Sequence, residues 1–275
     1  MLSGSRTPPA LVFAVTALAP LLSLLSAAVL PEPRLAGDAD GGVGAQVAAL
    51  VVALRRPRVH RPLAFFFLQA ALVPSVSQAM LFFATDVLRF SPEFLAAQGV
   101  LAYLCFLLGS VLYSRYVSGV AFRNVFYYAQ AALALLSLGD LCLVLRLNLR
   151  VGIPDAAFVV GADSAATVIE RLTLQPFLVI AARVCPSGCE AALYAFFMST
   201  FNFGHTASGV FGTFITPYFG VASGNYDGLP KLLAFRSCCM LVPILLIRHL
   251  IPELSAPSDT KSSDETTTVE GKKSN

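Results

Sequence analysis

The sequence predicts an all-α, polytopic membrane protein with about seven transmembrane helices. Apolar residues make up 56% of the 275-residue chain and charged residues only 13%, which is about half the charged share of a typical soluble domain. So few polar side chains could not cover the surface of a water-soluble protein of this length. Apolar runs that reach the roughly 20 residues of a bilayer-spanning helix also recur along the chain.

Seven such runs are expected to cross the membrane. The first is longer than the apolar core of a signal peptide, about 7 to 15 residues, so a true span is favoured and cleavage is the alternative. The third begins with Ser91-Pro92-Glu93, a capping serine, a proline at the first helical position and an acid in the first turn. The sixth is too long for one straight span. The runs cover residues 9–30, 62–87, 92–113, 124–145, 156–182, 189–218 and 229–251.

Residues 31–61, between the first and second runs, are expected to form a cytoplasmic linker. Residues 46–56 predict a helix that is too short to cross a bilayer and lies along the membrane surface. Four arginines at its end would meet anionic lipid and orient the chain, since basic residues favour the cytoplasmic side. They are Arg55, Arg56, Arg58 and Arg61. Residues 252–275 are polar and predict a disordered cytoplasmic tail.

Four ionisable residues lie inside the predicted spans, where a charge costs at least about 2.5 to 3.5 kcal/mol on insertion scales. They are Asp140 in the fourth span and Asp163, Glu170 and Arg171 in the fifth. Asp163 and Glu170 share a helix face, which should line a cavity or meet a partner helix. The alternative is an internal ion pair, such as Arg171 with Asp140 or Asp163, that only locks helices together.

The second span carries Pro74 among the polar residues Gln69, Ser75 and Gln78. A proline inside a helix removes one main-chain hydrogen bond and predicts a kink. Broken helices at mid-membrane are common at the substrate sites of transporters. The alternative, favoured for a single proline, is a packed kink in which serine hydroxyls satisfy the main chain.

Small residues recur every four positions in the sixth span, at Gly204, Ser208 and Gly212. This spacing predicts close packing against another helix. Asn202 and His205 lie beside the stripe, and the histidine is more often a packing residue than a proton carrier in such a position.

The sequence contains none of the enzyme motifs sought: no phosphate-binding glycine loop, no H-E-x-x-H and no nucleophile elbow. Three histidines in all are too few to predict a multi-histidine metal centre. We therefore expect no catalytic site, metal or cofactor. The net charge of +3 gives no indication of a nucleic-acid partner.

Two longer motifs resemble the folate–biopterin transporter family of the major facilitator superfamily. The first is SVSQAMLFFATDVLRFSPEFL at residues 75–95, and the second is LQPFLVIAARVCPSGCEAALYAFFMSTFNFG at residues 174–204. In the second, a basic residue, Cys-Pro, a glycine and a helix-opening glutamate match the family pattern, and a polar position follows. These are Arg183, Cys185, Pro186, Gly188, Glu190 and Asn202. Asp163 and the GIPD run at residues 152–155 also fall where the family has similar residues.

The resemblance covers most of residues 8–252 and implies the C-terminal half of a fold of about twelve helices, plus one helix. Residues 1–30 would be the family's sixth helix and residues 62–251 the six-helix half. A secondary active transporter of folates or pterins is implied, working by alternating access with proton coupling, or a truncated form of one. Asp163 and Glu170 would serve coupling or substrate binding, and Arg171 a substrate carboxylate.

A non-transporting, half-length membrane protein is the alternative function. It would pack with the missing N-terminal half or with a partner subunit. Either protein is an integral multi-pass membrane protein, and the plastid envelope and the plasma membrane are both open as its location.

Cys185 and Cys189 are four positions apart, which is not the C-x-x-C spacing of zinc and redox sites. Pro186 would stop one helix, and Ser187 with Glu190 has the spacing of a capping box that starts the next. The segment therefore predicts a rigid turn on the cytoplasmic side with two reduced thiols.

Overall fold

The computed structural model describes residues 9–30, 43–184 and 190–251. Among these residues the secondary structure is helical, apart from one isolated bridge between Ala222 and Asn225. The chain divides into two units, Met1–Gly44 and Ala45–Asn275, and each is described by itself.

In the first unit, the predicted first span is the helix α1, Pro9–Val29. Its apolar side chains are exposed along the whole length, as suits a helix that would be surrounded by lipid. Its hydroxyl groups bond to the main chain one turn earlier: Ser23 Oγ donates to Ala19 O at 3.0 Å and Ser26 Oγ to Leu22 O at 2.8 Å. These polar groups are therefore satisfied within the helix.

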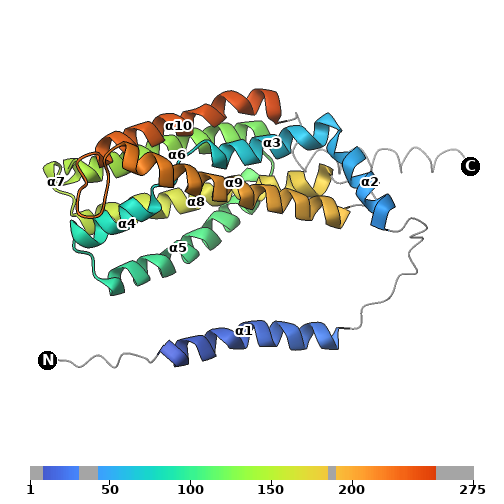
Figure 1. Cartoon of the computed structure of the whole chain (residues 1–275), viewed down its shortest axis with the longest axis horizontal. Coiled ribbons are helices and arrows are strands. Elements are labelled where there is room, and N and C mark those ends of the chain that lie inside the picture. The colour runs from blue at the N-terminus through green and yellow to red at the C-terminus, as the bar shows by residue number, and fades with distance from the viewer. Residues whose placement is uncertain (1–8, 31–42, 185–189, 252–275) are drawn as a thin grey trace, which may run out of the picture. The chain divides into compact units, whose positions relative to one another are not determined.

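The second unit is a bundle of helices, several of which run side by side along its length (Figure 1). Figure 1 shows α2 at one end of this bundle and α7 at the other. The helices are α2 (Val43–Leu54), α3 (Pro57–Ala71), α4 (Ser77–Asp86), α5 (Pro92–Leu112), α6 (Phe122–Val144), α7 (Leu147–Arg150), α8 (Asp155–Val184), α9 (Glu190–Tyr218) and α10 (Leu229–Leu250), with a π-helical turn at Tyr113–Val117.

Among the described residues, five helices are long and apolar enough to cross a membrane: α1, α5 with its π-helical turn, α6, α8 and α10. The expected sixth span is α9, a single continuous helix of 29 residues that is not among these five. The expected second span is instead divided between α3 and α4, with non-helical residues around Pro74. An all-α membrane protein is thus confirmed, and the second span is a broken helix rather than a kinked one.

The predicted start of the third span is confirmed at α5. Ser91 Oγ accepts a hydrogen bond from Phe94 N at 3.2 Å, Pro92 occupies the first turn, and Glu93 follows it. The linker helix is also found: α2 places Ala53 in the core, while the arginines after it are exposed. Contact of these arginines with lipid stays a prediction.

Phenylalanine rings form the main core of the second unit. Phe66 of α3 lies edge-on to Phe126 of α6 and Phe177 of α8, with ring centroids 5.5 and 4.3 Å apart. Phe177 in turn contacts Phe197 of α9 at 6.4 Å. Such aromatic pairs add about 0.5–1.5 kcal/mol each beyond the area they bury. One cluster of rings thereby joins α3, α6, α8 and α9.

The small-residue stripe of α9 packs as predicted. A side-chain carbon at Gly204 would lie 3.0 Å from Phe67 O of α3, and one at Gly212 would lie 2.0 Å from Ser75 O. The helix therefore approaches the α3–α4 segment as closely as two main chains can.

Most of the predicted turn motif lies outside the described residues, namely Cys185, Pro186, Ser187, Gly188 and Cys189. Its flanks are described: Arg183 lies in the last turn of α8 with its guanidinium 5.9 Å from the Phe122 ring centroid, and Glu190 begins α9. Where the structure describes a cysteine, it is a free thiol.

Candidate functional site

A cavity of about 720 Å³ lies within the second unit, between α3 to α6 and α8 to α10. This volume falls in the range of small-molecule sites, about 300–1,000 Å³. Apolar and aromatic side chains make up much of its wall, and polar groups from seven helices and the break interrupt them. The polar lining residues are Gln69, Ser75, Ser77, Gln98, Gln130, Asp140, Asp163, Glu170, Thr173, His205, Ser208 and Arg236.

The break between α3 and α4 forms one part of the wall, with Pro74 and Ser75. Ser75 N donates to Ser208 O at 3.1 Å, and Ser208 Oγ donates to Val73 O at 2.6 Å. Ser75 Oγ and Ser77 Oγ are hydrogen-bonded at 3.0 Å. The main-chain groups freed by Pro74 are thus taken up by a serine, as predicted, but the serine belongs to α9.

Asp140 of α6 forms an ion pair with Arg236 of α10, with 3.1 Å between Oδ2 and a guanidinium nitrogen. The two side chains are 28% and 22% exposed. Further along the same pair of helices, Ser137 Oγ donates to Ser237 Oγ at 2.8 Å and Gln130 Nε2 donates to Met240 O at 2.9 Å. A polar seam therefore joins α6 to α10 beside the cavity.

Asp163 and Glu170 both project from α8 into the cavity lining. Gln98 Nε2 of α5 donates a hydrogen bond to Asp163 Oδ2. Both carboxylates are exposed, and they interact electrostatically with each other and with the Asp140–Arg236 pair. The sequence prediction that these acids share one face and line a cavity is therefore confirmed.

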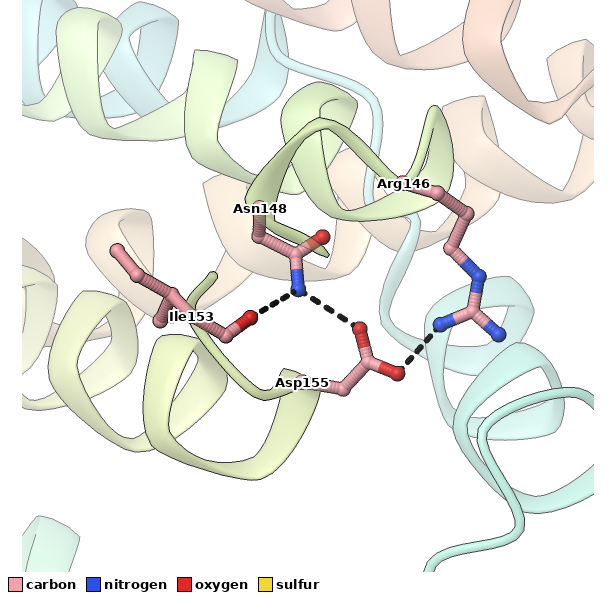
Figure 2. A network of polar contacts seen from close by, with 4 residues as sticks. All are labelled: Arg146, Asn148, Ile153 and Asp155. Carbon is pink, nitrogen blue, oxygen red and sulfur yellow. Dashed lines mark hydrogen bonds and ion pairs between the residues drawn. The ribbon is translucent and has the colours of Figure 1, made fainter. Parts of the chain in front are cut away.

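The start of α8 is held by a polar network in the connection from α6 (Figure 2). Asn148 Nδ2 donates to Ile153 O at 3.1 Å and to Asp155 Oδ1 at 2.8 Å, while Arg146 donates to Asp155 Oδ2 at 2.5 Å. Both oxygens of Asp155 are thus engaged at the positive end of the helix dipole. The GIPD run therefore fixes the start of α8 at Asp155. Asp163 lies about two turns after this start, and Glu170 lies about four turns after it.

The family was identified by comparison with known proteins. The model of the BT1 family matches residues 4–271. The chain belongs to the BT1 family. The resemblance seen in the two sequence motifs is thereby confirmed.

Several curated relatives are named as folate–biopterin transporters. "Probable folate-biopterin transporter 4" of Arabidopsis thaliana is 32% identical over 201 residues, covering 73% of this chain and 41% of the relative. "Folate-biopterin transporter" of Synechocystis is 32% identical over 234 residues, covering 85% and 47%. "Probable folate-biopterin transporter 9, chloroplastic" of Arabidopsis is 31% identical, covering 90% and 48%.

This BT1-family chain spans about half the length of the curated relatives it matches. No solved structure matches it. The relatives are named as transporters rather than enzymes, and the apolar helices make the chain an integral multi-pass membrane protein.

Five of the eight substrate or coupling residues predicted from the sequence meet at the cavity of this BT1-family chain. Gln69, Ser75, Asp140, Asp163 and Glu170 all line it. Gln78 of α4 and Asn202 of α9 are exposed and do not belong to its lining.

Arg171 also lies outside the cavity lining. Its Nε donates to Ser110 Oγ at 2.6 Å, and its guanidinium lies 4.0 Å from the centroid of the Phe106 ring. The expected internal ion pair of Asp140 exists, but its partner is Arg236. The interpretation of Arg171 as that partner is wrong, because its side chain turns toward α5 instead.

The polar cavity residues that the sequence did not predict include Arg236 and Gln98. Arg236 lies inside the predicted seventh span, where the rule that marked Asp140 applies equally to an arginine. Gln98 carries no charge and sits in an apolar run, so its pairing with Asp163 depends on the packing of α5 against α8.

Proposed function

We propose that the chain takes part in the transport of folates or pterins across a membrane, with the 720 Å³ cavity as one wall of the substrate path. The observation that carries this proposal is the set of charged groups on that wall, Asp140, Asp163, Glu170 and Arg236. Ionisable groups are costly inside apolar helices and mark substrate or ion pathways there. Membership of a family with members named folate–biopterin transporters supports this substrate class.

The proposed mechanism is alternating access coupled to protons. Asp163 and Glu170 are exposed on the cavity wall, about two turns apart on α8, so each could gain and lose a proton as the cavity changes sides. In this scheme Asp140 has a structural role, because it forms an ion pair with Arg236. The α3–α4 break supplies main-chain groups at the cavity, as broken helices do in other transporters.

Uptake into proteoliposomes tests this proposal. Labelled folate and biopterin are supplied to vesicles that contain the 275-residue chain, with and without an inward proton gradient. We expect gradient-dependent uptake by the native chain, its loss in Asp163→Asn, and no effect of Asp227→Asn, a matched exposed carboxylate outside the cavity. Gradient-dependent uptake by Asp163→Asn at normal protein levels would contradict the coupling role.

The second candidate is a non-transporting protein that packs with a partner. The chain's coverage of about half of each relative favours it, because the wall described here would then need a second wall from elsewhere. Co-expression with the part of the Synechocystis relative that this chain does not match separates the two functions. Uptake by the chain alone supports the first candidate. Co-purification without uptake in either preparation supports the second.

A further inference from the structure

Three hydrogen-bond donors on the cavity wall already bond to the protein. Arg236 donates to Asp140 at 3.1 Å, Gln98 donates to Asp163, and Gln130 donates to Met240 O at 2.9 Å. Arg236 is also the only Lys or Arg among the described lining residues. A ligand carboxylate would therefore meet a guanidinium that an internal carboxylate already holds.

Three of the groups left over are acceptors. The Glu170 carboxylate accepts no hydrogen bond from the described residues, while Thr173 Oγ1 donates to its main-chain oxygen at 2.7 Å. Asp163 uses one carboxylate oxygen for Gln98 and keeps the other. In Gln69 of α3, which lines the same cavity, Oε1 is buried without a partner in the described part of the chain. A buried acceptor without a donor is destabilising, and a ligand donor would relieve that cost.

Flat apolar surfaces lie in the same lining. Phe158 of α8 and Phe201 of α9 are half-buried there, while Phe66 and Phe177 belong to the core behind them. Rings of this kind contact the faces of a planar heterocycle, while groups at the edge fix its orientation.

Resting on the proposed function, we propose that this wall binds the pteridine head of the substrate by its aminopyrimidine edge, with the Glu170 carboxylate as the acceptor of both donors and Asp163 beside it. A pterin carries a ring N3–H beside an exocyclic 2-amino group, two parallel donors that match the two oxygens of one carboxylate. Charge-assisted bidentate pairs of this kind are among the strongest hydrogen bonds in proteins. The glutamate tail of a folate is repelled by the same carboxylates and lies away from this wall.

Equilibrium binding to the 275-residue chain in lipid nanodiscs tests the orientation with four probes. Biopterin and folate share the head, the lumazine used is the biopterin derivative with a carbonyl in place of the 2-amino group and the same C6 side chain, and 4-aminobenzoylglutamate is the folate tail alone. We expect Kd values for biopterin and folate within about threefold, at least tenfold weaker binding of lumazine, and no competition by the tail compound. A tenfold difference corresponds to about 1.4 kcal/mol, the order of one charge-assisted hydrogen bond.

Substitution of Glu170 tests whether its carboxylate accepts the hydrogen bonds of the pteridine head. Glu170→Gln should weaken biopterin and folate alike by at least tenfold, and Asp227→Asn should leave both unchanged. The lumazine comparison needs no variant, so it decides the matter even if Glu170→Gln does not fold. Equal binding of lumazine and biopterin, or competition by the tail, overturns the orientation while transport of folates stands. Binding of none of the four probes overturns the transport proposal and the orientation together.

Discussion

Gly212 marks the closest approach of α9 to the break in the second span. A side-chain carbon there would lie 2.0 Å from Ser75 O, a main-chain atom that cannot rotate away. One turn earlier, Ser208 donates to Val73 O and accepts from Ser75 N. These two residues together hold an irregular main chain inside a membrane protein, where unsatisfied polar groups are costly.

Gly212→Ala should destabilise the protein although alanine is the better helix former. The added carbon forces the α3–α4 break away from α9, and overpacking of this kind costs about 1–3 kcal/mol. Gly209→Ala in the same helix is the matched control, because nothing lies within 4 Å of its added carbon, and it should gain up to about 1 kcal/mol of helix propensity. Thermal unfolding in detergent measures both. Equal melting temperatures for the two variants would contradict this account.

Arg236→Met should be more harmful than the double variant Asp140→Asn with Arg236→Met. The single change leaves the Asp140 carboxylate without its partner at a site only 28% exposed. Breaking a fully buried pair costs about 3–5 kcal/mol, so a loss of about 2 kcal/mol is expected here. Removing both charges restores part of that loss. Chemical denaturation of the wild type, Asp140→Asn, Arg236→Met and the double variant completes the double-mutant cycle. A double variant no more stable than Arg236→Met would rule out a structural ion pair.

At the scale of elements, the broken second span shows where sequence reasoning stops. Pro74 and the serines near it predict a disturbed helix, and the small-residue stripe predicts close packing of α9. Each signal is local and each is confirmed. That Ser208 of the stripe satisfies the main chain at Pro74 depends on a contact 135 residues apart. A single sequence does not encode that pairing visibly, so the choice between kink and break could not be predicted.

A second long-range contact joins the end of α4 to the segment before α10. Tyr226 OH donates to Asp86 Oδ2 at 2.6 Å, and its ring lies edge-on to Phe83 with centroids 5.6 Å apart. The hydrogen bond to Asp86 raises the pKa of the Tyr226 phenol above its ordinary value, because ionisation would break the bond and place two negative charges together.

The stability from this contact should therefore depend on pH on the alkaline side. A raised folded-state pKa means that the contribution is fully present below the unfolded pKa of about 10. It is lost as pH rises through the higher folded-state value. The melting temperatures of wild type and Tyr226→Phe should differ by a constant amount up to about pH 9 and converge above pH 10. A difference that does not change with pH would contradict the predicted linkage.

At the scale of the whole molecule, composition and apolar runs predicted the class and nearly all the helices. Charges in apolar runs also predicted much of the cavity, since Asp140, Asp163 and Glu170 all line it. The direction in which each side chain turns was not predictable. Arg171 follows Glu170 directly, so it points to another side of α8 and contacts α5. Arg236 was overlooked although it obeys the same rule as the three acids.

The orientation of the bundle across the membrane is the remaining prediction from charge. The arginine-rich segment after α2 lies at the end of the second unit opposite α7 (Figure 1), and basic residues favour the cytoplasmic side. In a chain whose native cysteines are replaced, Arg56→Cys should react with a membrane-impermeant maleimide only after the cells are permeabilised. Ser223→Cys, in the exposed segment between α9 and α10, should react in intact cells. The connection between α9 and α10 lies at the end of the bundle opposite α2 (Figure 1), so the reverse labelling pattern would invert the orientation. Labelling of both positions from one side would mean that the bundle does not span the membrane as proposed.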